Sequence, residues 1–277
     1  MVGRGKRFTE EEIASWPHII FILGGPGSGK GTQCSKLCAE FKSAKHLSAG
    51  DLLRAERKKG TSQGEMIEQY IKEGKIIPVE VTAKLLKDAI DKDKNRFDVF
   101  LIDGFPRDIK NQRGWEKMCG QGGYHVELML MFECSEEIMT KRLLQRGETS
   151  GRSDDNIASI RKRLRTYIKD TIPVVKSFEN QKKLVRIESN RPVNQVYAEV
   201  RRVFEPIMDR KLLGRRLFGG RLPSIRTLIK SSLTYNLVIR ALRFVFASKP
   251  TSAIPRRHIF EHALHVCECF DQRHAKD

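Results

Sequence analysis

Short apolar segments alternate with amphipathic ones along most of the chain. Five apolar segments have the length and composition of buried strands, at residues 18–23, 46–48, 99–102, 127–132 and 184–187. The segments between them repeat apolar residues at helical spacing, which predicts helices over 32–41, 62–73, 79–90, 135–145, 157–180 and 193–204. Strands that alternate with helices predict an α/β fold, with a five-stranded parallel sheet flanked by helices.

The two ends of the chain differ from this alternating region. Residues 1–16 are polar and mixed in charge, so we expect a loose arm rather than a signal or transit peptide. Residues 17–207 form the predicted α/β domain. Residues 208–277 are expected to be a separate basic extension.

The composition is that of a soluble globular protein, with 39% hydrophobic and 31% charged residues. No apolar run approaches the roughly 18 residues of a membrane span. The net charge is +18, and residues 208–277 contribute half of it with 14 Lys and Arg against 5 Asp and Glu. Such a basic chain suits polyanionic nucleotides. We expect no nucleic acid as a partner, because no nucleic-acid motif accompanies the charge.

The six cysteines form no CxxC pair and no regular framework. This favours a reducing compartment over a set of disulfides. Cys34 and Cys38 are four residues apart on a predicted helix, and buried thiols explain them better than metal ligands do.

A glycine-rich segment follows the first predicted strand and precedes a predicted helix. Its sequence from Gly24 to Gln33 is GGPGSGKGTQ. Glycines allow successive backbone N–H groups to turn toward one anion at a helix N-terminus. Lys30 can then reach the outer phosphates of a nucleotide, and Thr32 offers the hydroxyl closest to a bound Mg²⁺. Glycines also serve ordinary tight turns, but the strand, glycines, lysine and helix together predict a nucleoside triphosphate site.

Two further clusters follow predicted strands. In the segment 47–54, Ser48 or Asp51 can cap a helix that carries Arg54 one turn later. In the segment 100–107, a buried strand ends in Asp103, followed by a glycine turn and Arg107. The carboxyl ends of parallel strands are where ligands bind, and an acid there can contact Mg²⁺ through water.

The fourth cluster is a polar loop at 146–156, with Gly147 and Gly151 as possible hinges, followed by a helix bearing Arg161, Arg163 and Arg165. Taken singly, each arginine in these clusters is more often a solvated surface charge than a functional group. Five of them, however, fall within motifs that together match one protein family.

These four clusters together resemble the nucleoside monophosphate kinase family, which includes adenylate kinases and UMP-CMP kinases. The similarity covers residues 18–206 and is greatest to the eukaryotic UMP-CMP branch. It rests on GGPGSGKGTQ, the segment 75–80 (KIIPVE), Gly104-Phe105-Pro106-Arg107 and the segment 150–156 (SGRSDDN). The family pattern also accounts for Gly31, which stands where the general phosphate-loop motif has Ser or Thr. The resemblance implies a P-loop NTPase-like domain with a monophosphate-binding arm at about 48–78 and a short lid at about 145–156.

The resemblance also implies roles for individual residues, with several residues serving more than one role. ATP would be bound by Gly27, Ser28, Gly29, Lys30, Gly31, Thr32, Arg146 and Arg191. The acceptor monophosphate would be bound by Ser48, Arg54, Lys75, Ile76, Ile77, Gly104, Phe105, Pro106, Arg107, Asn111, Arg152 and Arg163. Catalysis would rest on Lys30, Arg107, Arg146, Arg152 and Arg163. The cofactor implied is Mg²⁺ bound with ATP, with Thr32 as a ligand and Asp103 acting through water.

Two positions bear on the acceptor base. Adenylate kinases typically have Thr where this chain has Ala49, and Gln where it has Asn111. Both differences match the UMP-CMP branch and favour a pyrimidine. The resemblance therefore implies transfer of the ATP γ-phosphoryl group to UMP or CMP, and to dCMP, in pyrimidine nucleotide metabolism. Two alternatives remain, an adenylate kinase with AMP as acceptor and a nucleotide-dependent switch or scaffold.

The expected chemistry needs no general base, because an acceptor phosphate with a second pKa of about 6 is already largely a dianion at neutral pH. Positioning, charge and exclusion of water carry the reaction instead. The family resemblance further implies a monomer in the cytoplasm or nucleus.

The extension 208–277 departs from the family, whose members usually end near its start. One interpretation is a basic amphipathic helix at 224–246 that docks on a membrane or a partner protein. We favour a poorly ordered appendage, because the apolar residues leave no clean polar face. Cys267 and Cys269 lie near three histidines, but their spacing matches no standard metal site.

Overall fold

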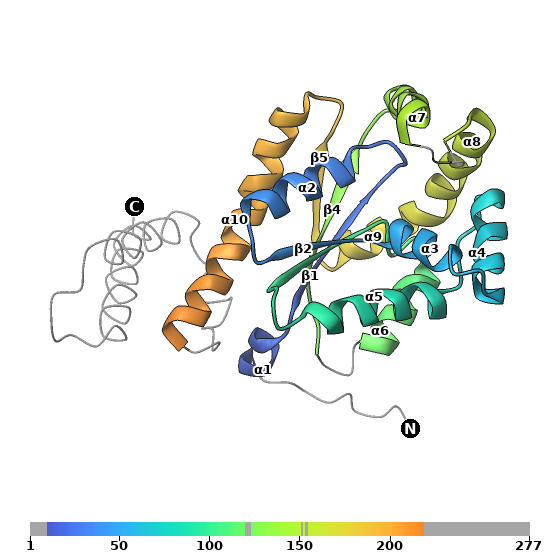
Figure 1. Ribbon diagram of the computed structural model, residues 1–277. Coiled ribbons are helices and arrows are strands. Elements are labelled where there is room, and N and C mark those ends of the chain that lie inside the picture. Colours follow the sequence, from blue (N-terminus) through green and yellow to red (C-terminus); the bar gives the residue numbers. More distant parts are fainter. Residues whose placement is uncertain (1–9, 120–122, 151, 153–154, 219–277) are drawn as a thin grey trace, which may run out of the picture. The chain divides into compact units, whose positions relative to one another are not determined.

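A computed structural model of the protein describes residues 10–119, 123–150, 152 and 155–218. Within this part of the chain, one compact unit contains residues 16–205, and a second contains residues 10–15 and 206–218. The first unit is built around a parallel sheet (Figure 1).

The sheet has five strands, as the apolar segments predict. They are β1 (His18–Gly24), β2 (Ala44–Ser48), β3 (Val99–Asp103), β4 (His125–Glu133) and β5 (Leu184–Glu188). Their order is β2-β3-β1-β4-β5, and all neighbouring pairs are parallel. Each strand contains the predicted segment and extends it by a few residues at most.

The register of β1 with its two neighbours defines one edge of the sheet. Ile22 pairs with Asp103 of β3, and Gly24 pairs with Phe132 of β4. The carboxyl ends of these three strands therefore meet at the same edge, and the strand order reverses at β1. Loops that leave such a point diverge, which opens a crevice for ligands.

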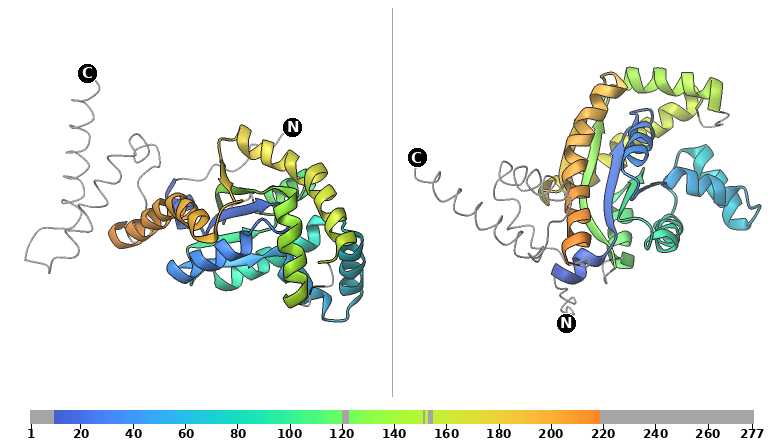
Figure 2. Two further views of the ribbon diagram at one scale, coloured as in Figure 1. Left: turned by 90° about the horizontal axis from the view of Figure 1, so that it is seen from above. Right: turned by 60° about the vertical axis from the view of Figure 1, so that its left-hand side comes forward.

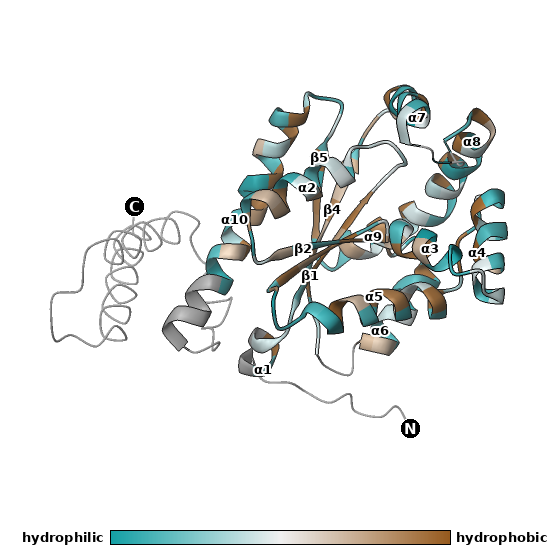
Figure 3. Cartoon of the chain, viewed as in Figure 1, coloured by the Kyte–Doolittle hydropathy of each residue, from teal (hydrophilic) through white to brown (hydrophobic). Residues whose placement is uncertain are grey.

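Helices cover both faces of this sheet (Figure 2). On one face, β1 directs Ile19, Phe21 and Leu23 into a buried cluster shared with α5 (Val79–Asp93), α6 (Ile109–Cys119) and α9 (Ile172–Asn180). Alternate residues such as Ile20 point to the opposite face, where α2 (Lys30–Glu40) and residues 193–205 of α10 (Val193–Phe218) lie. Because both faces are covered, the central strands are hydrophobic over most of their length (Figure 3).

The remaining helices surround the carboxyl edge of the sheet. They are α3 (Ala49–Arg57), α4 (Ser62–Glu73), α7 (Glu136–Ser150), α8 (Ile157–Thr166) and the π-helix η1 (Tyr167–Thr171). Ser48, Thr61 and Asn156 cap α3, α4 and α8, each accepting a hydrogen bond from a first-turn backbone N–H. The cap at Ser48 confirms the predicted start of the helix that carries Arg54.

Several predicted boundaries are wrong. Residues 10–15 form the helix α1 (Glu10–Ser15) inside the predicted loose arm, and α6 was not predicted. The predicted helix 157–180 is interrupted by η1. The last helix, predicted to end at 204, passes through Pro206 and continues to Phe218. Local propensity does not reveal such continuations, because tertiary contacts override it. The rest of the predicted extension, 219–277, lies outside the described residues.

Among the described residues, no helix is both long and apolar enough to cross a lipid bilayer. The cysteines in this part of the chain, Cys34, Cys38, Cys119 and Cys134, are all free thiols. Burial raises the pKa of the Cys34 thiol well above its usual value, which agrees with the prediction of a buried thiol.

The packing of α5 on α6 generates a test of the fold. A Cβ atom at Gly114 would lie 2.4 Å from Cγ2 and 2.8 Å from Cγ1 of Val79, a β-branched side chain with little freedom to move. Gly114→Ala should therefore lower the free energy of unfolding by about 1–3 kcal/mol through overpacking, although alanine favours helix formation. Urea denaturation measures the loss. The double variant Gly114→Ala/Val79→Ala should recover most of it, and a fully additive double variant would contradict the proposed contact.

Candidate functional site

The glycine-rich loop joins β1 to α2 at the carboxyl edge of the sheet. Gly27 and Gly29 have positive φ values of 85° and 92°, and a Cβ at Gly27 would lie 2.6 Å from the backbone oxygen of Met139. Only glycine suits such positions. The helix α2 begins at Lys30, two residues earlier than predicted, and no side chain caps it. Its first-turn N–H groups are therefore available to an anion.

Lys30 lies across this loop. Its Nζ donates hydrogen bonds to the backbone oxygens of Gly24 and Gly25, at 2.9 and 2.8 Å. Burial lowers the pKa of Lys30 to about 8, and the charges of Arg107 and Arg163 act in the same direction, whereas Asp103 opposes them. Burial therefore disfavours the charged form of Lys30, and an incoming anion would offset this effect.

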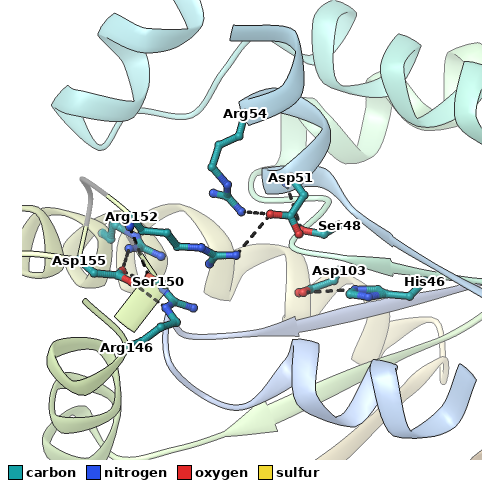
Figure 4. A network of polar contacts seen from close by, with 10 residues as sticks. His46, Ser48, Asp51, Arg54, Asp103, Arg146, Ser150, Arg152 and Asp155 are labelled. Atoms are coloured by element: carbon teal, nitrogen blue, oxygen red, sulfur yellow. Dashed lines mark hydrogen bonds and ion pairs between the residues drawn. The ribbon is translucent and has the colours of Figure 1, made fainter. Parts of the chain in front are cut away.

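Asp103 ends β3 beside the loop. Its Oδ2 lies 3.6 Å from Nε2 of His46 on the neighbouring strand β2 (Figure 4). Burial would raise the pKa of Asp103, but the nearby His46 and the charge of Lys30 outweigh it and keep the carboxyl ionised. No cluster of three or more His, Cys, Asp and Glu side chains suited to a metal occurs in the described chain. Asp103 and Thr32 both offer side-chain oxygens in the cavity over the loop.

A cavity of about 640 Å³ lies over the loop, and most of the predicted site residues line it. From the predicted ATP set it contains Gly27, Ser28, Gly29, Lys30, Gly31, Thr32, Arg146 and Arg191. From the predicted acceptor set it contains Ser48, Arg54, Gly104, Arg107, Arg152 and Arg163. Residues from six separate segments of the sequence are thus brought together at one edge of the sheet.

A smaller cavity of about 80 Å³ is lined by the rest of the predicted acceptor set, namely Lys75, Ile76, Ile77, Phe105 and Asn111. The two cavities share Arg54, Arg107 and Arg163. Pro106 lines neither. It is buried behind the turn, and the peptide bond that precedes it is cis.

Asp155 organises two of the arginines. Its fully buried carboxylate accepts hydrogen bonds from Arg146 at 2.6 and 2.8 Å and from Arg163 at 3.0 Å. Burial would raise the pKa of Asp155, but these two guanidinium groups outweigh it, so the pKa lies below its usual value. One carboxylate therefore fixes the direction of a residue from α7 and a residue from α8.

Asp51 performs a similar task on the other side of the larger cavity. Its Oδ1 accepts hydrogen bonds from Arg54 on α3 and from Arg152, the latter at 3.3 Å (Figure 4). Arg152 lies in the predicted lid and Asp51 in the predicted arm, so this contact joins the two. It is exposed to solvent, and such pairs exchange partners at little cost.

Arg191 has a different environment. Its guanidinium contacts Glu199 and lies 2.6 Å from Glu188, so both acids raise its pKa. It lines the larger cavity near the start of α10 and does not line the smaller one.

The lid prediction needs a correction. The helix α7 continues through Gly147 to Ser150, so Gly147 is not a hinge. A Cβ there would lie 2.8 Å from the backbone oxygen of Asp155, so this glycine allows the two segments to approach closely. Gly151, the other predicted hinge, lies outside the described residues.

Several residues that shape the site have no clear signal in the sequence. The pattern of segment 150–156 gives Asp155 no role of its own, and that of segment 47–54 gives Asp51 only the role of a helix cap. The π-helix η1 also had no local signal. Its Thr171 donates a 2.8 Å hydrogen bond to the backbone oxygen of Arg107, and Tyr167 lines the larger cavity. A π-turn shifts the helix face, and this is often found at functional sites.

Comparison with known proteins gives a consistent result. The adenylate kinase family model matches residues 22–183. The chain is 47% identical over 196 residues to UMP-CMP kinase of Homo sapiens and 46% identical over 194 residues to that of Danio rerio, covering 68% of this chain and 97% of each relative. It is also 48% identical over 188 residues to UMP-CMP kinase 3 of Oryza sativa subsp. japonica, covering 68% of this chain and 86% of that protein.

The role of Asp155 can be tested by stability. Asp155→Asn should lower the free energy of unfolding by about 1–3 kcal/mol at neutral pH, because two partly buried guanidinium groups lose an ionic partner. The folded-state pKa of Asp155 is depressed, so its contribution is present above the unfolded value of about 3.9 and is lost as pH falls below it. Urea denaturation between pH 3 and pH 7 measures both effects. Asp88→Asn, at an exposed position on α5, is the matched control, and equal losses in the two variants would contradict this role.

The lowered pKa of Lys30 generates a second test. An anion that binds the loop should raise this pKa from about 8, so ATP binding at pH 8.5 should take up roughly 0.7 of a proton. Calorimetry in buffers of different ionisation enthalpy measures the uptake. Lys30→Arg, whose guanidinium stays charged, should show none. Binding by the unsubstituted chain without proton uptake would mean that the ammonium does not meet the anion.

Proposed function

Because the chain belongs to the adenylate kinase family, we propose that it transfers the γ-phosphoryl group of ATP to UMP or CMP, and to dCMP. Its UMP-CMP kinase relatives support a pyrimidine acceptor. The observation that carries the proposal is the meeting of two cavities at three arginines.

Each cavity would bind one of the two substrates. The larger one contains the phosphate-binding loop and suits ATP, whose phosphates would lie against Lys30 and the first-turn N–H groups of α2. The smaller one has apolar walls and suits the base of the acceptor. The acceptor phosphate would then lie where the cavities join, against Arg54, Arg107 and Arg163. Such a placement brings the two phosphates end to end, as in-line transfer requires.

The reaction demands positive charge rather than a base. The acceptor phosphate is already a nucleophilic dianion at neutral pH. The obstacle is repulsion between two polyanions, which Arg146, Arg152 and Arg163 would reduce while stabilising the charge on the transferring group. Arginine suits this work because its planar fork contacts two phosphate oxygens at once and keeps its charge.

Mg²⁺ is the expected cofactor, and the residues present fit it. This ion prefers oxygen ligands and is usually held by one or two protein groups together with phosphates and waters. Thr32 and the ionised Asp103 both line the larger cavity next to the loop. When bound, Mg²⁺ neutralises phosphate charge during transfer. Thr32 would contact it directly, and Asp103 would orient its water.

Closure over the substrates would exclude water, which otherwise accepts the phosphoryl group. The contact of Asp51 with Arg54 and Arg152 joins the arm to the lid at the acceptor side of the larger cavity. An acceptor phosphate carries more charge than this carboxylate. We therefore infer that the phosphate displaces Asp51 and takes over both arginines.

A substrate panel tests the proposed function. The purified full chain with Mg-ATP should phosphorylate UMP, CMP and dCMP with kcat/KM values at least about tenfold above that for AMP, because a site shaped for one base leaves polar groups unpaired with another. ADP formation with each acceptor measures the rates.

Lys30→Met controls for contaminating kinases and should lose most of the activity, because the ATP phosphates lose their ammonium partner. A preference for AMP would identify an adenylate kinase instead. Tight nucleotide binding without transfer to any acceptor would favour the nucleotide-dependent switch.

A further inference from the structure

The smaller cavity combines apolar walls with two uncharged polar side chains. Ala49, Leu53, Ile77 and Phe105 on its walls are all buried hydrophobic residues. Thr82 and Asn111 also line it and are 6% and 3% exposed. A polar group buried among apolar ones is costly unless it forms a hydrogen bond. The partners of these two side chains therefore matter.

The hydroxyl of Thr82 has no hydrogen-bonding partner in the described part of the chain. The backbone N–H of Thr82 donates to Pro78 within the first turn of α5, but the side chain makes no such contact. A threonine in a helix often bonds to the preceding turn, which removes its hydroxyl from other use. Here the hydroxyl is left free at a cavity wall.

The side chain of Asn111, in contrast, is already engaged in a hydrogen bond. Its Oδ1 accepts a 3.3 Å hydrogen bond from the backbone N–H of Arg107. Its backbone N–H donates to Asp108 at 2.6 Å, which fixes the start of α6. The engaged oxygen orients the amide, so its NH₂ group is the part left for the cavity. Asn111 is therefore chiefly a donor toward whatever enters.

The packing of α5 on α6 places both side chains. The close contact of Val79 with Gly114 brings the two helices together, and Thr82 lies three residues after Val79 while Asn111 lies three residues before Gly114. Three residues are nearly one helical turn, so each side chain shares a face with the contact. The pair is thus set by rigid helices rather than by a loop.

We propose that Thr82 is a specificity-determining residue whose hydroxyl forms a hydrogen bond with the pyrimidine base of the acceptor. This inference rests on the proposed function. Uracil and cytosine differ at position 4, where one carries a carbonyl acceptor and the other an amino donor. A hydroxyl can rotate to donate or to accept. Thr82 therefore complements the donor amide of Asn111, and the two together satisfy either base.

The test compares Thr82→Val with Thr82→Ser in the full chain. Valine keeps the shape and removes the hydroxyl, so the dissociation constants for UMP and CMP and their KM values should rise roughly ten- to a hundredfold. KM for ATP should change by less than about twofold. Serine restores the hydroxyl and should recover most of the affinity.

Ribose 5-phosphate separates a contact with the base from a general structural effect, because it carries the sugar and phosphate without a base. Calorimetry should give the same affinity for it in all three proteins. Unchanged UMP and CMP affinities in Thr82→Val would overturn the proposal, as would an equal loss of ribose 5-phosphate binding. Failure of the unsubstituted chain to phosphorylate UMP or CMP would instead refute the proposed function.

Discussion

Mutual repulsion among cationic side chains is the constraint around which this molecule is organised. Lys30 and seven arginines line one cavity at the edge of the sheet, among them Arg54, Arg107, Arg146, Arg152 and Arg163. Without ligand, Asp51 and Asp155 each bind two of the arginines, and Asp103 offsets the charge of Lys30. Burial is the largest cause of the lowered pKa of Lys30, and the charges of Arg107 and Arg163 act in the same direction. The cationic side chains that line the cavity outnumber its carboxylates, which favours anions.

The carboxylates differ in burial, and this difference has a functional meaning. Asp155 is enclosed and fixes Arg146 and Arg163, so these two are held in place before any ligand arrives. Asp51 is largely exposed, and its arginines can exchange it for a phosphate at little cost. One pair thus gives a rigid part of the site, and the other gives a part that can rearrange as the arm and lid close.

Recognition of charge and recognition of the base are carried by separate parts of the fold. The charged groups come from loops and helix ends at the carboxyl edge of the sheet. The two uncharged groups of the smaller cavity, Thr82 and Asn111, come from the packed helices α5 and α6. Phosphate binding tolerates movement of the arm and lid, because long arginine side chains can adjust to keep contact with the phosphate. A hydrogen bond that discriminates between bases needs fixed geometry, which a helix pair provides.

The sequence by itself determined the strand segments, their parallel arrangement, the phosphate-binding loop and the arginines. The strands and the loop follow from local patterns, namely apolar runs and glycine spacing, and the arginines follow from motifs that match the family. It could not determine the extent of α7 and α10, the π-helix η1 or the roles of Asp51, Asp155 and Thr82. Each of these depends on a partner distant in the chain or on the absence of one. Only the tertiary structure decides which carboxylate meets which arginine and which hydroxyl stays unpaired, because those outcomes depend on contacts between segments that no local pattern encodes.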